Sequence, residues 1–286
     1  MKVVPICSDS MGVRSLCVYV ETEELKLLLD PSAALGPSRY GLPPAEEEWQ
    51  ALEEFKKEIR EIAIHCNAFV ISHYHYDHYD PDENFWEGKK VFIKDPKNNI
   101  NRSQKERAAF FFEKFSKISH LIVSDNTEWH FGNTLIKFSG PMHHGNEKSR
   151  LGFVIATVVE EKGYRVVHAS DVQGPIVEES VEEIIGLEPD LLIIDGPPTY
   201  FLGWKFSTKD LERANANLVR IIQETGAKLV LDHHLLRDLN YRERCEMVYA
   251  YKNVQTFAEF LGKENRMLEA HRKELMRDFR ENMSIA

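Results

Sequence analysis

The chain has 286 residues, 43% of them apolar and 29% charged, a composition typical of ordered globular proteins rather than disordered ones. Its formal net charge of −10 disfavours broad, nonspecific binding of nucleic acid, because phosphate binding depends on clustered Lys and Arg. No apolar run approaches the roughly 18 residues that span a bilayer, and the first ten residues lack the pattern of a secretory signal. Together with four scattered cysteines and no C-x-x-C pair, these features favour a cytoplasmic protein with reduced thiols.

In the first half of the chain, short apolar strands alternate with amphipathic helices. From Trp49 to Ile62, apolar residues recur every three or four positions, which predicts a helix. Residues 31–44 before it are rich in Pro, Gly and Ser, which is typical of a loop. A second helix is predicted at 103–118. The predicted strands are 2–6, 16–20, 27–29, 68–72, 90–93, 120–123 and 134–138.

The second half adds a hairpin and further strand–helix units. Ser207 with Asp210 three residues later resembles the capped start of a helix, and Gly226 is a natural stop for it. The other predicted elements are the hairpin strands 152–159 and 165–169, a short helix at 181–185, and strands at 191–194 and 229–231. Because strands and helices are interspersed, we expect two sheets covered by helices. The stretch from about Tyr241 is helical in character.

The most specific pattern is SHYHYDH at residues 72–78, an H-x-H-x-D-H sequence directly after a predicted strand. Random placement of the available His and Asp residues gives such a pattern roughly once per thousand chains of this size. A loop after a strand can turn several neighbouring side chains toward one point. Imidazoles and carboxylates are good ligands for zinc and similar divalent ions. The segment therefore predicts a metal site.

Other histidines and one aspartate follow other predicted strands. Strand ends gather at a common rim of a sheet protein, so we expect these side chains to lie near residues 73–78. Since neighbouring residues of a strand face opposite ways, one histidine of each adjacent pair is expected to face the metal. The residues are His143 and His144, Asp171, and His233 and His234.

These segments carry a family resemblance. The series HYHYDH, PMHHG, ASDVQG and LDHHLL resembles the ligand series of the metallo-β-lactamase superfamily, and Asp30 resembles its early acidic residue. The resemblance spans about residues 30–234 and is closest to an archaeal branch of metal-dependent hydrolases. It implies an α/β fold, a four-layer αββα sandwich of two mixed β-sheets flanked by helices. The expected organisation is a catalytic domain at 1–240 with a helical extension, 241–286, packed on it.

The resemblance also implies a set of metal ligands. His73 and His75 would bind one ion, Asp77 and His78 would bind the second, and Asp171 would bridge the two. The third histidine of the first ion is His144 or His143, and the spacing Pro141-x-x-His144 favours His144. The last ligand is His234 or His233, with a slight preference for His234. Asp30 and His168 are expected to support ligands from behind, although a strand histidine such as His168 is more often a satisfied core residue.

The expected cofactors are two divalent ions, Zn²⁺ first, with Mn²⁺ or Fe²⁺ as alternatives because His and Asp suit all three. Two metals that share a water lower its pKa toward neutrality and polarise the bond under attack. Asp77 would be both a ligand and a catalytic proton acceptor. The expected activity is hydrolysis of an ester, thioester, lactone or phosphodiester.

Three other functions compete with this one. A nucleic-acid phosphodiesterase or ribonuclease is suggested by the basic segment 94–107, but only 61 residues separate Asp171 from His233, too few for the large inserted domain of the processing ribonucleases. A redox di-metal protein would show a carboxylate at His75. A catalytically silent metal-binding module would lose ligands, and here the set is complete. The expected partner is therefore a small-molecule or phosphodiester substrate, with nucleic acid not favoured and no membrane.

Some residues near these segments are candidates for the rest of the pocket. Asp195, Trp204 and Lys205 follow a predicted strand and are candidates for its edge. Arg237 and Asp238 follow the last histidines, where they would form either a supporting ion pair or a surface pair.

Overall fold

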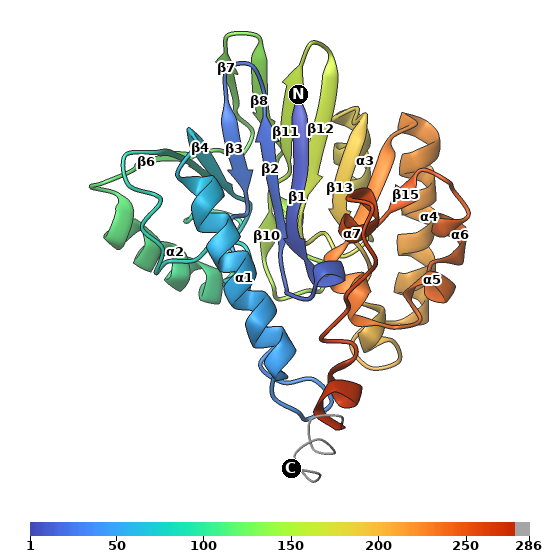
Figure 1. Cartoon of the computed structure of the whole chain (residues 1–286). Coiled ribbons are helices and arrows are strands. Elements are labelled where there is room, and N and C mark those ends of the chain that lie inside the picture. The colour runs from blue at the N-terminus through green and yellow to red at the C-terminus, as the bar shows by residue number, and fades with distance from the viewer. Residues whose placement is uncertain (278–286) are drawn as a thin grey trace.

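The computed structural model describes residues 1–277 and contains two mixed β-sheets between helices (Figure 1). The first sheet has the order β1-β2-β3-β4-β5-β6, and the second has the order β15-β14-β13-β12-β11-β8-β7. The strands of the first sheet are β1 (Lys2–Ser8), β2 (Leu16–Glu21), β3 (Lys26–Leu29), β4 (Ala68–Ile71), β5 (Lys90–Ile93) and β6 (His120–Val123). Those of the second are β7 (Glu128–Phe131), β8 (Thr134–Phe138), β11 (Thr157–Glu161), β12 (Tyr164–Ala169), β13 (Leu191–Asp195), β14 (Lys228–Asp232) and β15 (Val254–Gln255). A two-stranded ribbon, β9 (Met142–His143) and β10 (Phe153–Val154), lies between β8 and β11 in the chain.

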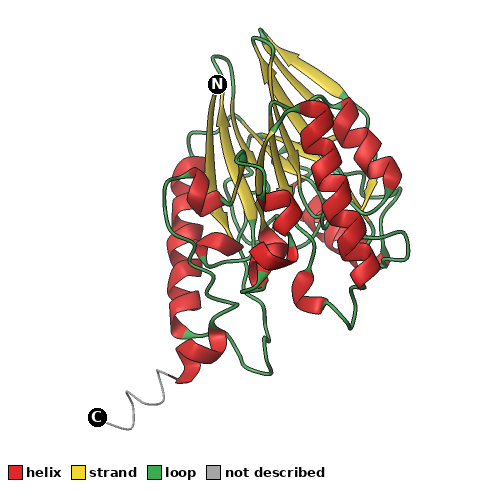
Figure 2. Cartoon of the chain, turned by 90° about the vertical axis from the view of Figure 1, so that its right-hand side faces the viewer, coloured by secondary structure: helices red, strands yellow, loops and turns green. Residues whose placement is uncertain are grey.

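Helices cover the outer face of each sheet, so the architecture has four layers, as Figure 2 shows. Buried apolar residues of α1 and α2 belong to the core of the first sheet, whereas those of α3 and α4 pack on the second sheet. The long helices are α1 (Glu46–Ala63), α2 (Arg102–Phe115), α3 (Glu178–Gly186) and α4 (Thr208–Thr225). The short ones are α5 (Tyr241–Arg244), α6 (Glu246–Tyr249) and α7 (Phe257–Phe260), with 3₁₀ turns η1 (Asp9–Met11), η2 (Thr199–Phe201) and η3 (His233–Arg237).

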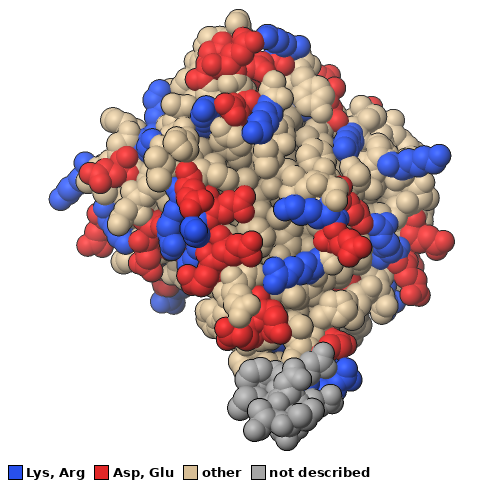
Figure 3. All heavy atoms as spheres, in the orientation of Figure 1, with Lys and Arg blue, Asp and Glu red and all other residues tan. Residues whose placement is uncertain are grey.

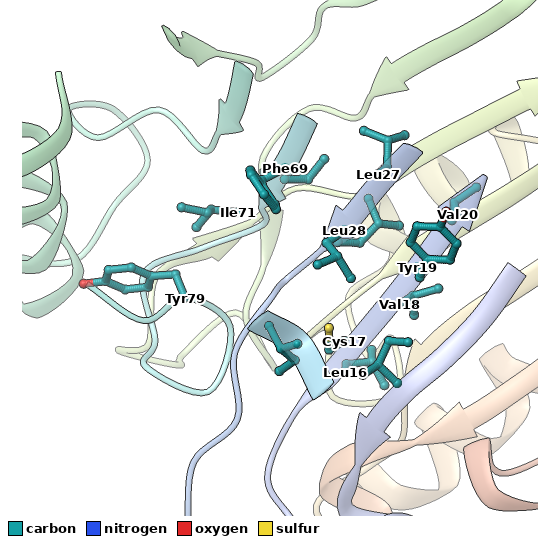
Figure 4. Close-up of a cluster of buried hydrophobic side chains, with 14 of the residues drawn as sticks. Leu16, Cys17, Val18, Tyr19, Val20, Leu27, Leu28, Phe69, Ile71 and Tyr79 are labelled. Carbon is teal, nitrogen blue, oxygen red and sulfur yellow. The ribbon is translucent and has the colours of Figure 1, made fainter. Parts of the chain in front are cut away.

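Side-chain alternation along the strands divides the apolar interior into two cores. In β13, Ile193 belongs to the core between the sheets, whereas Leu192 and Ile194 belong to the core under α3 and α4. Figure 4 shows part of the first core, where side chains such as Leu28 and Phe69 come from the paired strands β3 and β4. Each such side chain stabilises the fold by about 1.5–3 kcal/mol when it is fully buried.

Strand direction brings the ends of distant segments to one rim. β4, β5 and β6 run parallel to β3, and β13 and β14 run parallel to β12. The carboxyl ends of neighbouring parallel strands therefore share an edge in each sheet. This is the edge at which the predicted ligands follow their strands.

The fold confirms the predicted α/β sandwich of two mixed sheets and most of its elements. The strands β7 and β15 and the ribbon strand β9 were not predicted. The segment beyond residue 240 is more than a helical extension, because β15 pairs in parallel with β14 and completes the edge of the second sheet. Residues 278–286 of that predicted extension lie outside the described residues. The four cysteines are free and buried, and no helix within residues 1–277 is long and apolar enough to cross a membrane.

Candidate metal centre

The candidate centre lies where strands of both sheets end. The segment 73–78 follows β4, Asp171 follows β12, and His233 follows β14. Asp30, Asp171 and His233 have positive φ values of 48°, 60° and 59°. This left-handed backbone is costly for residues other than glycine and is found mainly where a turn must aim a side chain at a functional point.

One set of donor atoms consists of three imidazole nitrogens and one carboxylate oxygen. His75 Nδ1 lies 3.0 Å from His73 Nε2 and 3.2 Å from His144 Nε2. Asp171 Oδ2 lies 3.1 Å from His144 Nε2 and 3.5 Å from His73 Nε2. We call these four residues the three-histidine group. Their ligand atoms all lie within 4.8 Å of one another, a spacing that one metal ion can span.

A second set lies on the other side of Asp171. His78 Nε2 lies 3.1 Å from Asp171 Oδ1 and 3.8 Å from Asp77 Oδ1. His233 Nε2 lies 3.5 Å from Asp171 Oδ1 and 3.7 Å from Asp77 Oδ2. We call Asp77, His78, His233 and Asp171 the two-aspartate group. Asp171 thus presents a different oxygen to each group.

Asp30 holds the segment 73–78 in place from behind. Its Oδ1 accepts from the backbone N of Ser72 at 2.8 Å, and its Oδ2 accepts from the Ser72 hydroxyl at 2.6 Å. The same Oδ2 lies 3.0 Å from His78 Nδ1. A carboxylate at this nitrogen fixes the tautomer that leaves Nε2 free to bind a metal. Asp30 therefore holds both the backbone of Ser72 and the ring of His78.

Asp9 plays the same part for His233, although it was not among the residues expected from the sequence. Asp9 Oδ2 lies 2.7 Å from His233 Nδ1, across 224 positions of the chain. Arg237 Nε donates to Asp9 Oδ1 at 2.8 Å, and both side chains are buried. The ion-pair partner of Arg237 is therefore Asp9 and not the expected Asp238. Asp9 lies in η1, directly after β1, so its one available signal was that it too follows a strand.

His234 faces the centre without belonging to either group. Its Nδ1 lies 2.8 Å from Asp195 Oδ2, and its Nε2 lies 3.9 Å from Asp171 Oδ2. Asp195 is held in turn by the backbone N of Gln173, 2.9 Å from Oδ1. Burial lowers the pKa of His234 well below its usual value, so its imidazole is neutral. The geometry favours His233 over His234 as the ligand of the two-aspartate group.

The donor atoms fit divalent ions. Burial, reinforced by the neighbouring imidazoles, lowers the pKa of His73 and brings that of His75 to about 3, so both rings are neutral and can act as ligands. Burial alone would raise the pKa of Asp171, but the surrounding imidazoles outweigh it and hold the pKa well below its usual range. Burial also disfavours a charged His78, yet the carboxylates of Asp171 and Asp77 raise its pKa well above the usual value. The centre therefore attracts positive charge.

An unsatisfied atom supports the same fit. His78 Nε2 is buried and has no hydrogen-bond partner within residues 1–277, although Asp171 Oδ1 is near. Buried polar atoms without a partner are uncommon and call for an explanation such as a bound ion. With Nδ1 turned to Asp30, the free Nε2 can coordinate a metal ion.

The remaining predicted residues lie elsewhere. His143 lies outside both groups, with its ring centroid 4.7 Å from that of Phe153. His168 is buried, and its Nε2 lies 2.9 Å from the carbonyl oxygen of Leu16. That contact makes it a core histidine and not the expected support of a ligand.

The basic segment 94–107 exposes less free positive charge than its composition suggests. Lys94 is buried and paired with Asp125 at 2.6 Å, and Arg102 pairs with Glu106 at 2.9 Å. Arg107 donates to the carbonyl of Tyr74 at 3.2 Å. On the face shown in Figure 3, positive and negative side chains lie intermixed. The segment therefore gives no support to the nucleic-acid alternative.

Comparison with solved structures agrees with the fold. An isothiocyanate hydrolase from gut bacteria of Delia radicum aligns with a TM-score of 0.54 at 16% identity, covering 86% of this chain and 94% of that one. A metallo-β-lactamase fold protein, YhfI from Bacillus subtilis, aligns over 85% of this chain and 88% of that one with a TM-score of 0.48 and 16% identity. The two mixed sheets between helices, with the His and Asp residues of the resemblance at one rim, define a protein of the metallo-β-lactamase fold.

Comparison of sequences identifies the family to which the chain belongs. The UPF0282 protein of Methanopyrus kandleri is 43% identical, covering 96% of this chain and 99% of its own length. The UPF0282 proteins of Methanocaldococcus jannaschii and Pyrococcus furiosus are 43% and 44% identical, each aligned with 96% of this chain and with 96% and 92% of their own lengths. The chain belongs to the UPF0282 family. No family model matches it.

Proposed function

We propose that the chain is a metal-dependent hydrolase that holds one divalent ion in each donor group. The observation that carries this proposal is the position of Asp171, whose Oδ2 faces the three-histidine group and whose Oδ1 faces the two-aspartate group. A carboxylate shared in this way is suited to bridging two ions. The substrate is an ester, thioester, lactone or phosphodiester, taken from a small molecule in the cytoplasm.

Each group has donor atoms for a particular ion. His73, His75 and His144 offer three imidazoles, a set that suits zinc. Asp77, His78 and His233 add a second carboxylate, a set that also suits Mn²⁺ or Fe²⁺. When bound, two such ions supply the Lewis acidity that makes water nucleophilic near neutral pH and polarises the bond under attack.

The protein's own residues position the donor groups, accept a proton and contact the substrate. Asp171 holds the two groups at a fixed distance from each other, because its side chain is only 2% exposed and is surrounded by imidazoles. The Asp77 side chain is 19% exposed and is the more accessible carboxylate of its group, so it can accept a proton from water and pass it to solvent. His234, held by Asp195, is left to contact the substrate.

The test is metal analysis combined with a substrate panel. Protein loaded with Zn²⁺, Mn²⁺ or Fe²⁺ is dialysed and analysed, then assayed with phosphodiesters, lactones and thioesters. We expect about two ions per chain and turnover of one class, both removed by a chelator. Turnover that persists in metal-free protein would refute the proposal. Two bound ions with no turnover of any class would instead indicate a metal-binding module.

A further inference from the structure

A cavity of about 330 Å³ is lined in part by the loops that follow His144 and Asp171. Its wall includes Asn146, two residues after His144, and Gln173, two residues after Asp171. The backbone of Gln173 is fixed, because its N donates to Asp195 at 2.9 Å. The opposite wall comes from the turn after β13, which includes Phe201 and Lys205. The cavity and the candidate metal centre therefore share two loops of the chain.

The charge of this cavity is opposite to that of the chain. Lys148 and Lys205 line it, and none of its lining residues is acidic. An adjoining cavity of about 350 Å³ shares Lys148 and adds Lys209 and Arg213 against Glu147 and Asp210. The two cavities together carry four cations and two acids, in a chain whose net charge is −10.

The four cations are also unpaired. Across the described part of the chain, no ion pair joins Lys148, Lys205, Lys209 or Arg213 to a carboxylate. By contrast, Arg220, which lies on helix α4 with Lys209 and Arg213, pairs with three glutamates. The ammonium of Lys205 lies over two rings, 4.2 Å from the centroid of Trp204 and 5.3 Å from that of Phe201. These contacts hold its charge at the cavity without neutralising it.

Two other cavities show that this charge is local. A groove of about 710 Å³ beside Tyr76 is lined mainly by apolar side chains, with Lys56 already paired to Asp80. A cavity of about 430 Å³ on the outer face of the second sheet has Lys137 against four glutamates. Neither offers an unpaired cation next to the donor groups.

We propose that the cavity between Lys148 and Lys205 binds an oxyanion of the substrate, a phosphate or a carboxylate, while the bond to be cleaved lies at the donor groups. The inference rests on the proposed function for the position of the cleaved bond, but the anion site itself depends only on the lysines. Ammonium groups bind compact oxyanions by charge-assisted hydrogen bonds, which are about twice as strong as neutral ones. Anionic substrates are also steered toward such a cavity from solution.

The test is a titration of the full-length chain with inorganic phosphate and, separately, with acetate, followed by calorimetry. Each is done with metal-loaded and with chelator-treated protein, so that binding to metals is separated from binding to lysines. The double variant Lys148→Ala with Lys205→Ala is compared with Lys117→Ala combined with Lys252→Ala. The second pair removes the same charge from exposed lysines that line none of these cavities.

We expect the Lys148/Lys205 variant to bind one of the two anions at least tenfold more weakly in chelator-treated protein, and the control pair to differ less than twofold from the parent. Tighter binding of phosphate identifies a phosphate-bearing substrate, and tighter binding of acetate a carboxylate. The fluorescence of Trp204, assigned with Trp204→Phe, should change on binding. Equal affinity in both double variants, or no binding by the parent, overturns the inference. Lysine-dependent binding in a chain that takes up no metal would instead refute only the proposed function.

Discussion

The two donor groups of the centre differ in what lies behind their histidines. In the three-histidine group the support is neutral: His73 Nδ1 lies 3.0 Å from the hydroxyl of Ser72, and His144 Nδ1 has no hydrogen-bond partner within residues 1–277. In the two-aspartate group, each histidine has a buried carboxylate behind it. The three-histidine group thus has one carboxylate, the shared Asp171. The two-aspartate group has four carboxylates in or behind it: Asp77, Asp171, Asp30 and Asp9.

The difference predicts that the two groups would bind metal ions with unequal affinity. Nearby carboxylates stabilise a divalent cation, and a carboxylate behind a histidine makes that ligand more basic. We therefore expect the two-aspartate group to bind its ion more tightly and to accept harder ions such as Mn²⁺. The three-histidine group should prefer zinc and lose its ion first.

The largest expected effect comes from the residue that the groups share. Asp171→Ala removes an oxygen from each group and leaves the remaining imidazoles without a counter-charge, so both ions and all turnover should be lost together. Metal analysis after dialysis, with an activity assay on the same sample, measures this. Asp82→Ala is a matched control, because the Asp82 side chain is 88% exposed. A variant that kept both ions would show that Asp171 does not join the groups.

A pair of adjacent histidines tests the three-histidine group alone. His144→Ala should reduce the metal content from about two ions to about one, because one of three imidazoles is lost. His143→Ala should leave the content unchanged, since this ring packs on Phe153 outside the group. Equal loss in the two variants would mean that the assignment of His144 is wrong.

The carboxylate behind His233 provides a smaller effect on the other group. Asp9→Asn keeps the shape but removes the charge, and should weaken binding to the two-aspartate group about 10–100-fold. Zinc titration against a competing chelator should show one weakened step and one unchanged step. Asp9 also pairs with the buried Arg237, so a thermal melt of the metal-free variant must accompany the titration to separate lost affinity from lost folding. If both zinc-binding steps weakened equally, Asp9 would not act on the two-aspartate group alone.

The smallest effect on metal binding is expected from Glu269, which reaches the centre only through Arg237 and Asp9. Glu269 pairs with Arg14 through two contacts of 2.6 and 2.7 Å, and it also faces the Arg237 that holds Asp9. Burial opposes the charge of Glu269, but these arginines lower its pKa from 4.5 to about 2. Its contribution to stability is therefore fully present above pH 4.5 and is lost as the pH falls toward 2.

Glu269→Gln should lower the free energy of unfolding by about 2 kcal/mol at pH 7, the value of a hydrogen-bonded charged group. The difference from the parent should shrink at pH 3, because Glu269 of the unfolded parent is then mostly protonated while the folded parent still keeps its charge. Urea unfolding at both pH values measures this. A difference that did not depend on pH would mean that the carboxylate charge is not what stabilises this contact.

The sequence alone determined the parts of this protein that depend on neighbouring residues. The segment 73–78 holds four of the donor residues within six positions, so one loop after one strand suffices to gather them. The strands and long helices follow from apolar spacing, a local property. The order of His and Asp residues at later strand ends was enough to anticipate Asp171 and the histidine pairs, because parallel strands end at a common edge.

Tertiary structure decided whatever depended on residues far apart. Which histidine of each pair joins a donor group is set by the backbone turn, and the positive φ of His233 has no signal in the sequence. Asp9 reaches His233 across 224 positions because β1 and β14 end at the same rim, and no pattern links the two. β15 is a strand because the edge of β14 was open to it. Lys94 is buried against Asp125 and exposes no charge, since burial depends on what packs around a side chain and not on the side chain itself.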